Sequence, residues 1–198
     1  MLRPDYPVTT ARLLLRPFTP ADVDEVWAYQ RQPEVARYMP WAPRSRERSE
    51  AAVHQMVNEN GLGQEGDCLS LAVIWPEAGV DGGAGAGIGR LVGQIELVWH
   101  SEQSRQGELG YVFNPAYQGK GLATEAARAL LRWGFEEFDL HRIVGRCDAR
   151  NTASAGVLER LGMRREAHHI DSALREGAWR SEYVYAILEH EWRGGTHP

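Results

Sequence analysis

Short runs of apolar residues, many of them rich in Val, Ile and Leu, recur along the chain at the spacing of β-strands. They predict about seven strands, at residues 11–18, 68–75, 91–99, 107–114, 142–148, 163–170 and 180–188. The polar segment from Asp171 to Gly177 separates the last two runs, so we expect a hairpin turn there.

Helical spacing of apolar residues fills the intervals between these runs. The predicted helices cover residues 19–30, 33–38 (a short helix or turn), 46–60, 122–138 and 152–161. The first opens with Thr19, Pro20 and Asp22, which supply an N-cap residue, a proline at the first helical position and an acid that bonds back to the cap. The fourth has the clearest apolar stripe, made by Ala123, Ala127, Leu130, Leu131, Gly134, Phe135 and Phe138.

This order of elements predicts an α/β (α+β) fold, in which one domain spans residues 1–198 and a mixed, twisted sheet is flanked by helices. Two segments lie outside the pattern. The Gly- and Ala-rich segment 76–89 predicts a flexible hairpin loop, and we expect the tail 190–198 to lack a fixed structure. A dinucleotide-binding interpretation of Gly85 and Gly87 fails, because a strand rather than a helix follows them.

Composition narrows the functional classes. The formal net charge is −5 and the pI is about 5.8, a balance that disfavours a general nucleic-acid binder. Cys68 and Cys147 lack metal-binding spacing, and His168 and His169 would point to opposite faces of a strand, so we expect no metal site. The N-terminus lacks an apolar signal segment and no apolar run is long enough to span a bilayer, so we expect a cytoplasmic protein without membrane association.

The segment Gln118-Gly119-Lys120-Gly121-Leu122-Ala123-Thr124 carries the clearest chemical signal, because it joins a strand to the start of the long central helix. Backbone N–H groups at a helix N-terminus are unpaired and, together with the helix dipole, favour an anion. The two glycines would let a phosphate approach where a Cβ would block it. The glycine spacing of a P-loop is absent. The turn therefore predicts a phosphate site, where Lys120 either adds charge or is only solvated.

Further segments accompany this turn in a fixed order: Glu108-Leu109-Gly110-Tyr111, Asn151-x-x-Ser154, Leu161-Gly162-Met163 and Gly177-Ala178-Trp179-Arg180. In order and spacing the chain resembles the GNAT (Gcn5-related) N-acetyltransferases from residue 10 to residue 188. Within them it is most similar to the branch of the ribosomal-protein N-terminal (RimJ/RimL-type) acetyltransferases. The resemblance implies an N-acyltransferase that passes an acetyl or related acyl group from acetyl-CoA directly to a primary amine in a ternary complex.

The resemblance also implies where CoA binds. In this family the strand before the turn splays away from the next parallel strand, and the pantetheine arm enters the resulting V as an added strand would. A backbone N–H near Val112 would polarise the thioester carbonyl. The implied cofactor-binding residues are Tyr111, Val112, Phe113, Gln118, Gly119, Lys120, Gly121, Leu122, Ala123, Thr124, Asn151 and Ser154.

Two proton transfers are needed for acyl transfer to an amine. Our candidate base is Glu108, acting directly or through water, because it starts the strand that leads to the phosphate turn. In many GNAT enzymes a tyrosine seven residues after the equivalent of Asn151 protonates the leaving thiolate, but Leu158 occupies that position here. We therefore expect Ser154, one helical turn earlier, or a water molecule to supply this proton.

The acceptor is the least defined part of the prediction. The resemblance brings Trp41 and Trp179 near the incoming amine, where each either contacts the substrate or only packs. The acceptor is a protein N-terminal α-amine or a small-molecule amine such as an antibiotic, polyamine or amino acid; a non-catalytic acyl-CoA sensor is the third reading. The acidic net charge suits basic acceptors, and the last strands would allow a homodimer.

Overall fold

The computed structural model describes residues 1–76, 89–175 and 177–195, so the predicted loop 76–89 lies almost wholly outside the described residues. The described chain forms one eight-stranded sheet in the order β1-β2-β3-β4-β5-β6-β8-β7. The strands are β1 (Val8–Thr9), β2 (Leu14–Pro17), β3 (Cys68–Trp75), β4 (Arg90–Ser101), β5 (Gln106–Phe113), β6 (Arg142–Asp148), β7 (Arg164–Arg175) and β8 (Ala178–Leu188). The α-helices are α1 (Val23–Gln30), α2 (Pro33–Ala36), α3 (Arg46–Asn58), α4 (Leu122–Glu136), α5 (Thr152–Arg160) and α6 (Glu189–Gly194).

The sheet differs from the prediction at both of its edges. It has one strand more than the seven expected, because the two residues of β1 pair with Leu14 and Leu15 and are too few to show an alternating pattern. The final hairpin is also longer, since β7 continues past Ile170 to Arg175 instead of turning at Asp171. A register shift between His169 and Ala173 absorbs the polar segment within the strand.

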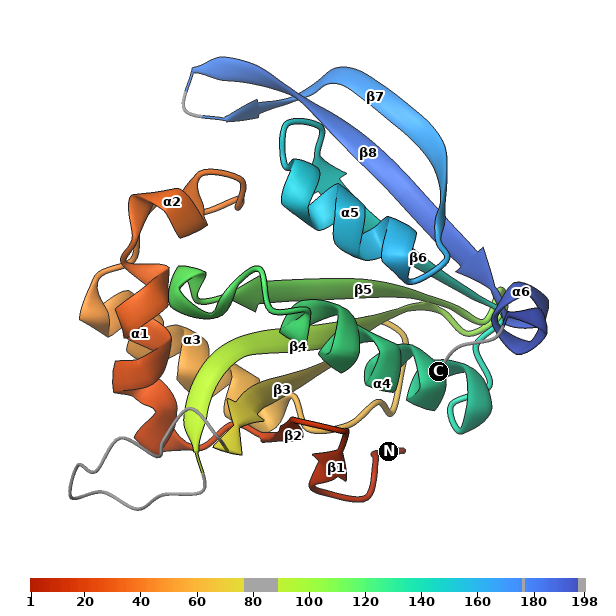
Figure 1. Ribbon diagram of the computed structural model, residues 1–198, viewed down its shortest axis with the longest axis horizontal. Coiled ribbons are helices and arrows are strands. Elements are labelled where there is room, and N and C mark those ends of the chain that lie inside the picture. Colours follow the sequence, from red (N-terminus) through yellow and green to blue (C-terminus); the bar gives the residue numbers. More distant parts are fainter. Residues whose placement is uncertain (77–88, 176, 196–198) are drawn as a thin grey trace.

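Helices cover both faces of the sheet (Figure 1), and each face has its own core. Helices α4 and α5 pack on one face, where Leu130, Phe135 and Leu158 are buried with residues of the strands. Helices α1, α2 and α3 supply the second core on the opposite face. Alternate residues of β5 enter the two cores, Phe113 the first and Val112 the second, as the period of two in a strand requires.

The C-terminal tail is partly ordered, contrary to the prediction for residues 190–198. Residues 189–194 form α6, and Trp192 is buried and stacks on Phe135 of α4 with ring centroids 5.8 Å apart. Burial of a tryptophan contributes a few kcal/mol, roughly enough to order a short helix. Residues 196–198 lie outside the described part of the chain. Among the described residues, no helix combines the length and apolar character needed to cross a bilayer.

Strands β5 and β6 form the one parallel pair among the eight strands, and they separate along their length. Pairing joins residues 106–109 to residues 142–145 and stops there. Beyond Leu109 and Gly145 no described strand pairs with either facing edge, although β5 continues to Phe113 and β6 to Asp148. This is the splay that the resemblance implied.

Candidate active site

A hollow of about 630 Å³ opens where β5 and β6 part. Its wall combines the end of β5, the glycine turn, the first turn of α4 and the start of α5. Every residue predicted to bind the cofactor lines this hollow except Lys120. The predicted residues come from three segments of the chain, 111–113, 118–124 and 151–154, and all three meet at one cavity.

Both glycines of the turn adopt backbone angles that disfavour other residues. Gly119 has φ 74° and Gly121 has φ 78°, in the left-handed region. A Cβ on Gly119 would meet no atom within 4 Å, and one on Gly121 would meet only Arg12 Nη2 at 3.6 Å. The backbone conformation therefore favours glycine at both positions. No protein atom crowds either glycine, so the space beside them is open to a ligand. Gly121 is the N-cap of α4, so the turn presents the helix N-terminus to the hollow.

Lys120 anchors the turn through its backbone, and its side chain lies outside the hollow. The Nζ atom lies 5.9 Å from the centroid of the Trp75 ring and does not line the hollow. The carbonyl oxygen of Lys120 accepts a hydrogen bond from Arg12 Nη1 at 3.0 Å. Of the two roles that the sequence left open, the structure therefore does not support direct phosphate contact by this side chain.

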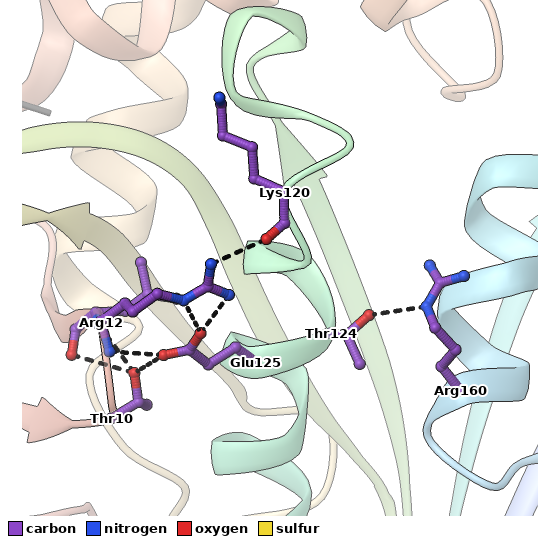
Figure 2. A network of polar contacts seen from close by, with 7 residues as sticks. Thr10, Arg12, Lys120, Thr124, Glu125 and Arg160 are labelled. Carbon is purple, nitrogen blue, oxygen red and sulfur yellow. Dashed lines mark hydrogen bonds and ion pairs between the residues drawn. The ribbon is translucent and has the colours of Figure 1, made fainter.

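Arg12 and Glu125 form a clamp beneath the turn (Figure 2). Glu125, in the first turn of α4, accepts from Thr10 Oγ1 at 2.6 Å, from Arg12 N at 2.8 Å and from Arg12 Nε at 2.7 Å. Burial alone would raise the pKa of Glu125, but these hydrogen bonds outweigh it and hold that pKa below its ordinary value. The clamp joins the loop before β2 to the phosphate turn, and motif reading missed it because its halves lie 113 residues apart.

The direction of the β5 backbone corrects one prediction. Asn114 N donates to Val92 O of β4 at 2.9 Å, and alternate residues of an antiparallel strand direct their amides to the same neighbour. Val112 therefore faces β4, and its carbonyl oxygen lies 2.6 Å from the position that a Cβ on Gly93 would take. The Val112 N–H is thus directed away from the gap, so the role predicted for it is not supported. Tyr111 and Phe113 turn their backbone groups toward the gap instead.

Ser154 and Tyr111 form a hydroxyl pair at the wall of the hollow. Their Oγ and Oη atoms lie 2.9 Å apart, and Tyr111 also donates to Ser154 O at 3.1 Å. Burial raises the pKa of Tyr111 above its ordinary value, so this phenol keeps its proton at neutral pH. Asn151 caps α5 by accepting from Ser154 N at 3.1 Å, which leaves its amide NH₂ for a ligand.

The position that holds a tyrosine in many GNAT enzymes is filled by packing. Leu158 is buried and its Cδ2 lies 2.6 Å from where a Cβ on Gly145 would be, so leucine and glycine fit together where the strands part.

Burial raises the pKa of Cys147 to about 11 and that of Cys68 to about 12. Neither thiol is therefore appreciably ionised at neutral pH, which disfavours a cysteine nucleophile.

Two carboxylates, Glu108 and Glu96, lie near the apex of the splay on the face opposite α4 and α5. Glu108 Oε2 is 2.9 Å from His100 Nε2 and accepts from Arg146 Nε at 3.2 Å, and neither carboxylate lines the hollow itself. Glu96 was missed by sequence reasoning because it sits in the middle of a strand pattern. Its Oε1 is 2.5 Å from where a Cβ on Gly110 would stand. Gly110 is the first residue of β5 that has no partner in β6.

Glu96 has the electrostatic setting of a proton acceptor. Burial, then the charges of Glu59 and Glu108, raise the pKa of Glu96 above its ordinary value, against a smaller opposing effect of Arg44. Its carboxylate has no hydrogen-bond or ion-pair partner in the described part of the chain. A carboxylate with a raised pKa and no partner can take a proton from a neighbouring group.

The predicted acceptor walls lie elsewhere. Trp41 packs against the second core with the Arg44 guanidinium 4.6 Å from its ring centroid, and Trp179 is 61% exposed on the final hairpin. Neither lines the hollow. Helix α2 and the residues after it form this side of the cavity instead, through Glu34, Val35, Tyr38 and Met39.

Comparisons with known proteins agree with this geometry. A family model described as an acetyltransferase (GNAT) domain matches residues 12–164. YnaD, an uncharacterized N-acetyltransferase of Bacillus subtilis (strain 168), is 35% identical over 190 residues, covering 93% of this chain and 98% of YnaD. The crystal structure of a GNAT-family acetyltransferase from Bacillus anthracis matches with a TM-score of 0.77 and 34% identity, over 92% of this chain and 98% of that one. The chain belongs to the GNAT acetyltransferases.

Two relatives that match over shorter stretches have named acceptors. The ribosomal protein uS5-alanine N-acetyltransferase of Escherichia coli (strain K12) is 34% identical over 87 residues, 44% of this chain and 45% of that protein. The spermidine N(1)-acetyltransferase of the same strain is 29% identical over 104 residues, 52% of this chain and 56% of that protein. Membership of the GNAT family and the N-acetyltransferase class, both expected from the motifs, are confirmed. These two relatives are named for a protein acceptor and a polyamine acceptor.

Proposed function

We propose that this enzyme transfers an acetyl group from acetyl-CoA to a primary amine while both substrates are bound. One observation carries the proposal: the glycine turn at the N-terminus of α4 and the open edge of β5 line the same hollow. The turn offers unpaired N–H groups and a positive helix end to the diphosphate. The open edge offers the backbone groups of Tyr111 and the N–H of Phe113 to the amide-bearing arm, whereas the Phe113 carbonyl oxygen already accepts from Gln118 Nε2 at 3.0 Å.

The proton transfers are assigned to groups on opposite faces of the sheet. The amine gives its proton to a carboxylate at the apex, as its nitrogen forms a bond to the acyl carbon and the carbon–sulfur bond breaks. Glu108, the base expected from the motif, is held by Arg146 and lies within hydrogen-bond distance of His100, so we favour Glu96 for this step. Ser154, hydrogen-bonded to Tyr111, or a water molecule beside it returns a proton to the thiolate.

The pH dependence of turnover distinguishes the two carboxylates. A base with a raised pKa is protonated as the pH falls, so the rate should decline on the acidic side of neutrality. We expect Glu96→Gln to lower kcat about 100-fold and to remove this acidic limb, with CoA affinity unchanged. Glu108→Gln is the matched control and should keep the limb. The reverse result would restore Glu108 as the base.

The acceptor is either a protein N-terminal α-amine, as for the uS5-alanine relative, or a small-molecule amine, as for the spermidine relative. Release of free thiol from acetyl-CoA with a panel of peptides and small amines tests the whole proposal. Tight CoA binding without release by any acceptor would instead favour a non-catalytic sensor. The exposed Ile170, Leu174 and Trp179 of the β7–β8 hairpin support the predicted homodimer, which sedimentation would test.

A further inference from the structure

A second hollow, of about 750 Å³, adjoins the first beside α2. Glu34 and Tyr38 line both hollows, so the second continues the acceptor side of the first. Its wall also holds three arginines from elements far apart in the sequence: Arg37 after α2, Arg150 between β6 and α5, and Arg180 in β8. The approach to the site is thus bordered by guanidinium groups.

Arg150 is held in place by a buried carboxylate. Asp148 accepts from Arg150 Nε at 2.8 Å and from Arg150 Nη2 at 2.6 Å. The hydrogen bond from Arg150 lowers the pKa of Asp148, which therefore stays ionised and keeps this fork intact at neutral pH. The Arg150 guanidinium lies 5.8 Å from the centroid of the Tyr38 ring, and Tyr38 O accepts from Arg175 Nη1 at 3.4 Å. These contacts tie α2 to the opposite wall.

The remaining arginines are less firmly held, although the charge of Arg180 helps to lower the pKa of Asp148. Neither Arg37 nor Arg180 forms an ion pair with a carboxylate in the described ranges, and Glu34 is the one acidic residue among the six that line the second hollow. The three arginines outnumber Glu34 and Asp148, so the local charge is positive, opposite in sign to the net charge of −5 for the chain. Guanidinium groups present a planar fork that matches a carboxylate or phosphate.

We propose that the acceptor is an amine that carries a carboxylate or phosphate group near its amino group, and that Arg37 and Arg180 hold this anion. The inference rests on the proposed transferase function and specifies its substrate class. A wholly cationic acceptor such as a polyamine would meet unfavourable charge at this mouth. The expectation from net charge alone, which favoured basic acceptors, is replaced here by the charge of the residues that border the site.

The test compares matched acceptors that differ only in the anion. One pair is the C-terminally amidated tripeptides Ala-Asp-Gly and Ala-Asn-Gly, and the other is phosphoethanolamine and ethanolamine; spermidine is the cationic reference. We expect kcat/KM for thiol release to be at least about fivefold higher for the anionic member of one pair, with the ratio falling as salt is added. The pair that responds identifies whether the anion is a peptide carboxylate or a phosphate.

Variants assign the preference to the arginines. Arg37→Ala combined with Arg180→Ala should bring the ratio to about one, chiefly through a lower kcat/KM for the anionic member. Arg193→Ala, on α6 at the far end of the molecule from α2 (Figure 1), is the control and should keep the wild-type ratio. Equal or faster use of neutral or cationic acceptors by the wild type, or a preference that survives the double substitution, would overturn the anion site alone. Absence of thiol release with every acceptor would contradict the transferase function itself.

Discussion

Replacing Arg12 by alanine tests how the phosphate turn is held. Arg12 neutralises Glu125 and also donates to the carbonyl oxygen of Lys120, between the two glycines of the turn. Glu125 lies in the first turn of α4, where its negative charge interacts favourably with the helix dipole. The same charge would repel a diphosphate bound at this helix end. Without the Arg12 side chain, Glu125 would keep its hydrogen bonds from Thr10 and the backbone of residue 12 but would lose its ion-pair partner close to the diphosphate, and the turn would lose one anchor.

The magnitude follows from the exposure of the pair. The side chains are 39% and 16% exposed, so the ion pair is partly screened. An exposed ion pair contributes up to about 1 kcal/mol, and a hydrogen bond such as that to Lys120 O contributes about 1 kcal/mol. A loss of roughly 1–2 kcal/mol in substrate binding corresponds to a KM for acetyl-CoA raised about 5- to 30-fold. The acyl-transfer step lies elsewhere in the site, so kcat should change less than about twofold.

A double-substitution cycle separates charge from mere stability. Arg12→Ala/Glu125→Gln removes the uncompensated carboxylate, so its KM for acetyl-CoA should return to within about threefold of wild type, although its melting temperature should not recover. Initial-rate kinetics at saturating amine, with CoA titrated by calorimetry, supply these values. A KM unchanged in Arg12→Ala, or a double variant no better than the single one, would refute the reasoning.

Three further predictions follow from the geometry. Gly121→Ala should weaken CoA binding at least about tenfold. Gly66 also has a positive φ (91°) and open space beside it, so Gly66→Ala is the control and should lower stability by a similar amount without affecting CoA binding. Equal effects of the two substitutions on CoA affinity would contradict the assignment of the turn. Ser154→Ala should lower kcat about tenfold at constant KM for acetyl-CoA, measured by thiol release. Asp22→Asn should lower the free energy of unfolding in urea by about 3 kcal/mol at pH 7, because the buried Asp22 carboxylate forms an ion pair with Arg16 in which Oδ1 and Nη2 are 2.7 Å apart.

The pH dependence of the last effect has a definite sign. Burial alone would raise the pKa of Asp22, but hydrogen bonds from Arg16 and Thr19 lower it below the ordinary value. The stabilisation is therefore complete above the unfolded pKa of about 3.9 and is lost as the pH falls through the lower folded value. The difference between Asp22→Asn and wild type should narrow in that acidic range and stay constant from pH 6 to 8.

Local signals in the sequence were sufficient for most of the helices and strands, and they predicted residues that line one hollow. Period and capping placed α1 and α4, and the glycine turn identified the hollow because its chemistry lies within a few consecutive residues. The tail was misjudged because Trp192 becomes buried only by packing on α4. Helix stability of this kind comes from tertiary contact, which no local pattern records.

The acceptor side depended on contacts between distant residues. The orientation of the Val112 amide follows from the register of β4 against β5, and the burial of Glu96 follows from strands and helices closing around it. Tryptophans stand out in a sequence, so Trp41 was an obvious candidate, yet it packs against the second core and does not line the hollow. The arginines of the second hollow come from three elements that only the folded chain brings together.

The parting of β5 and β6 has a consequence for the lifetime of the protein. Main-chain groups on two facing strand edges lack partners within the sheet, and an extended arm lying between them would complete the ladder. A ligand that binds only the native fold adds stability by mass action, about 2.7 kcal/mol at a concentration 100 times its Kd. Resistance to proteolysis should therefore rise with the concentration of acetyl-CoA, so that the enzyme is degraded faster when acetyl-CoA is scarce.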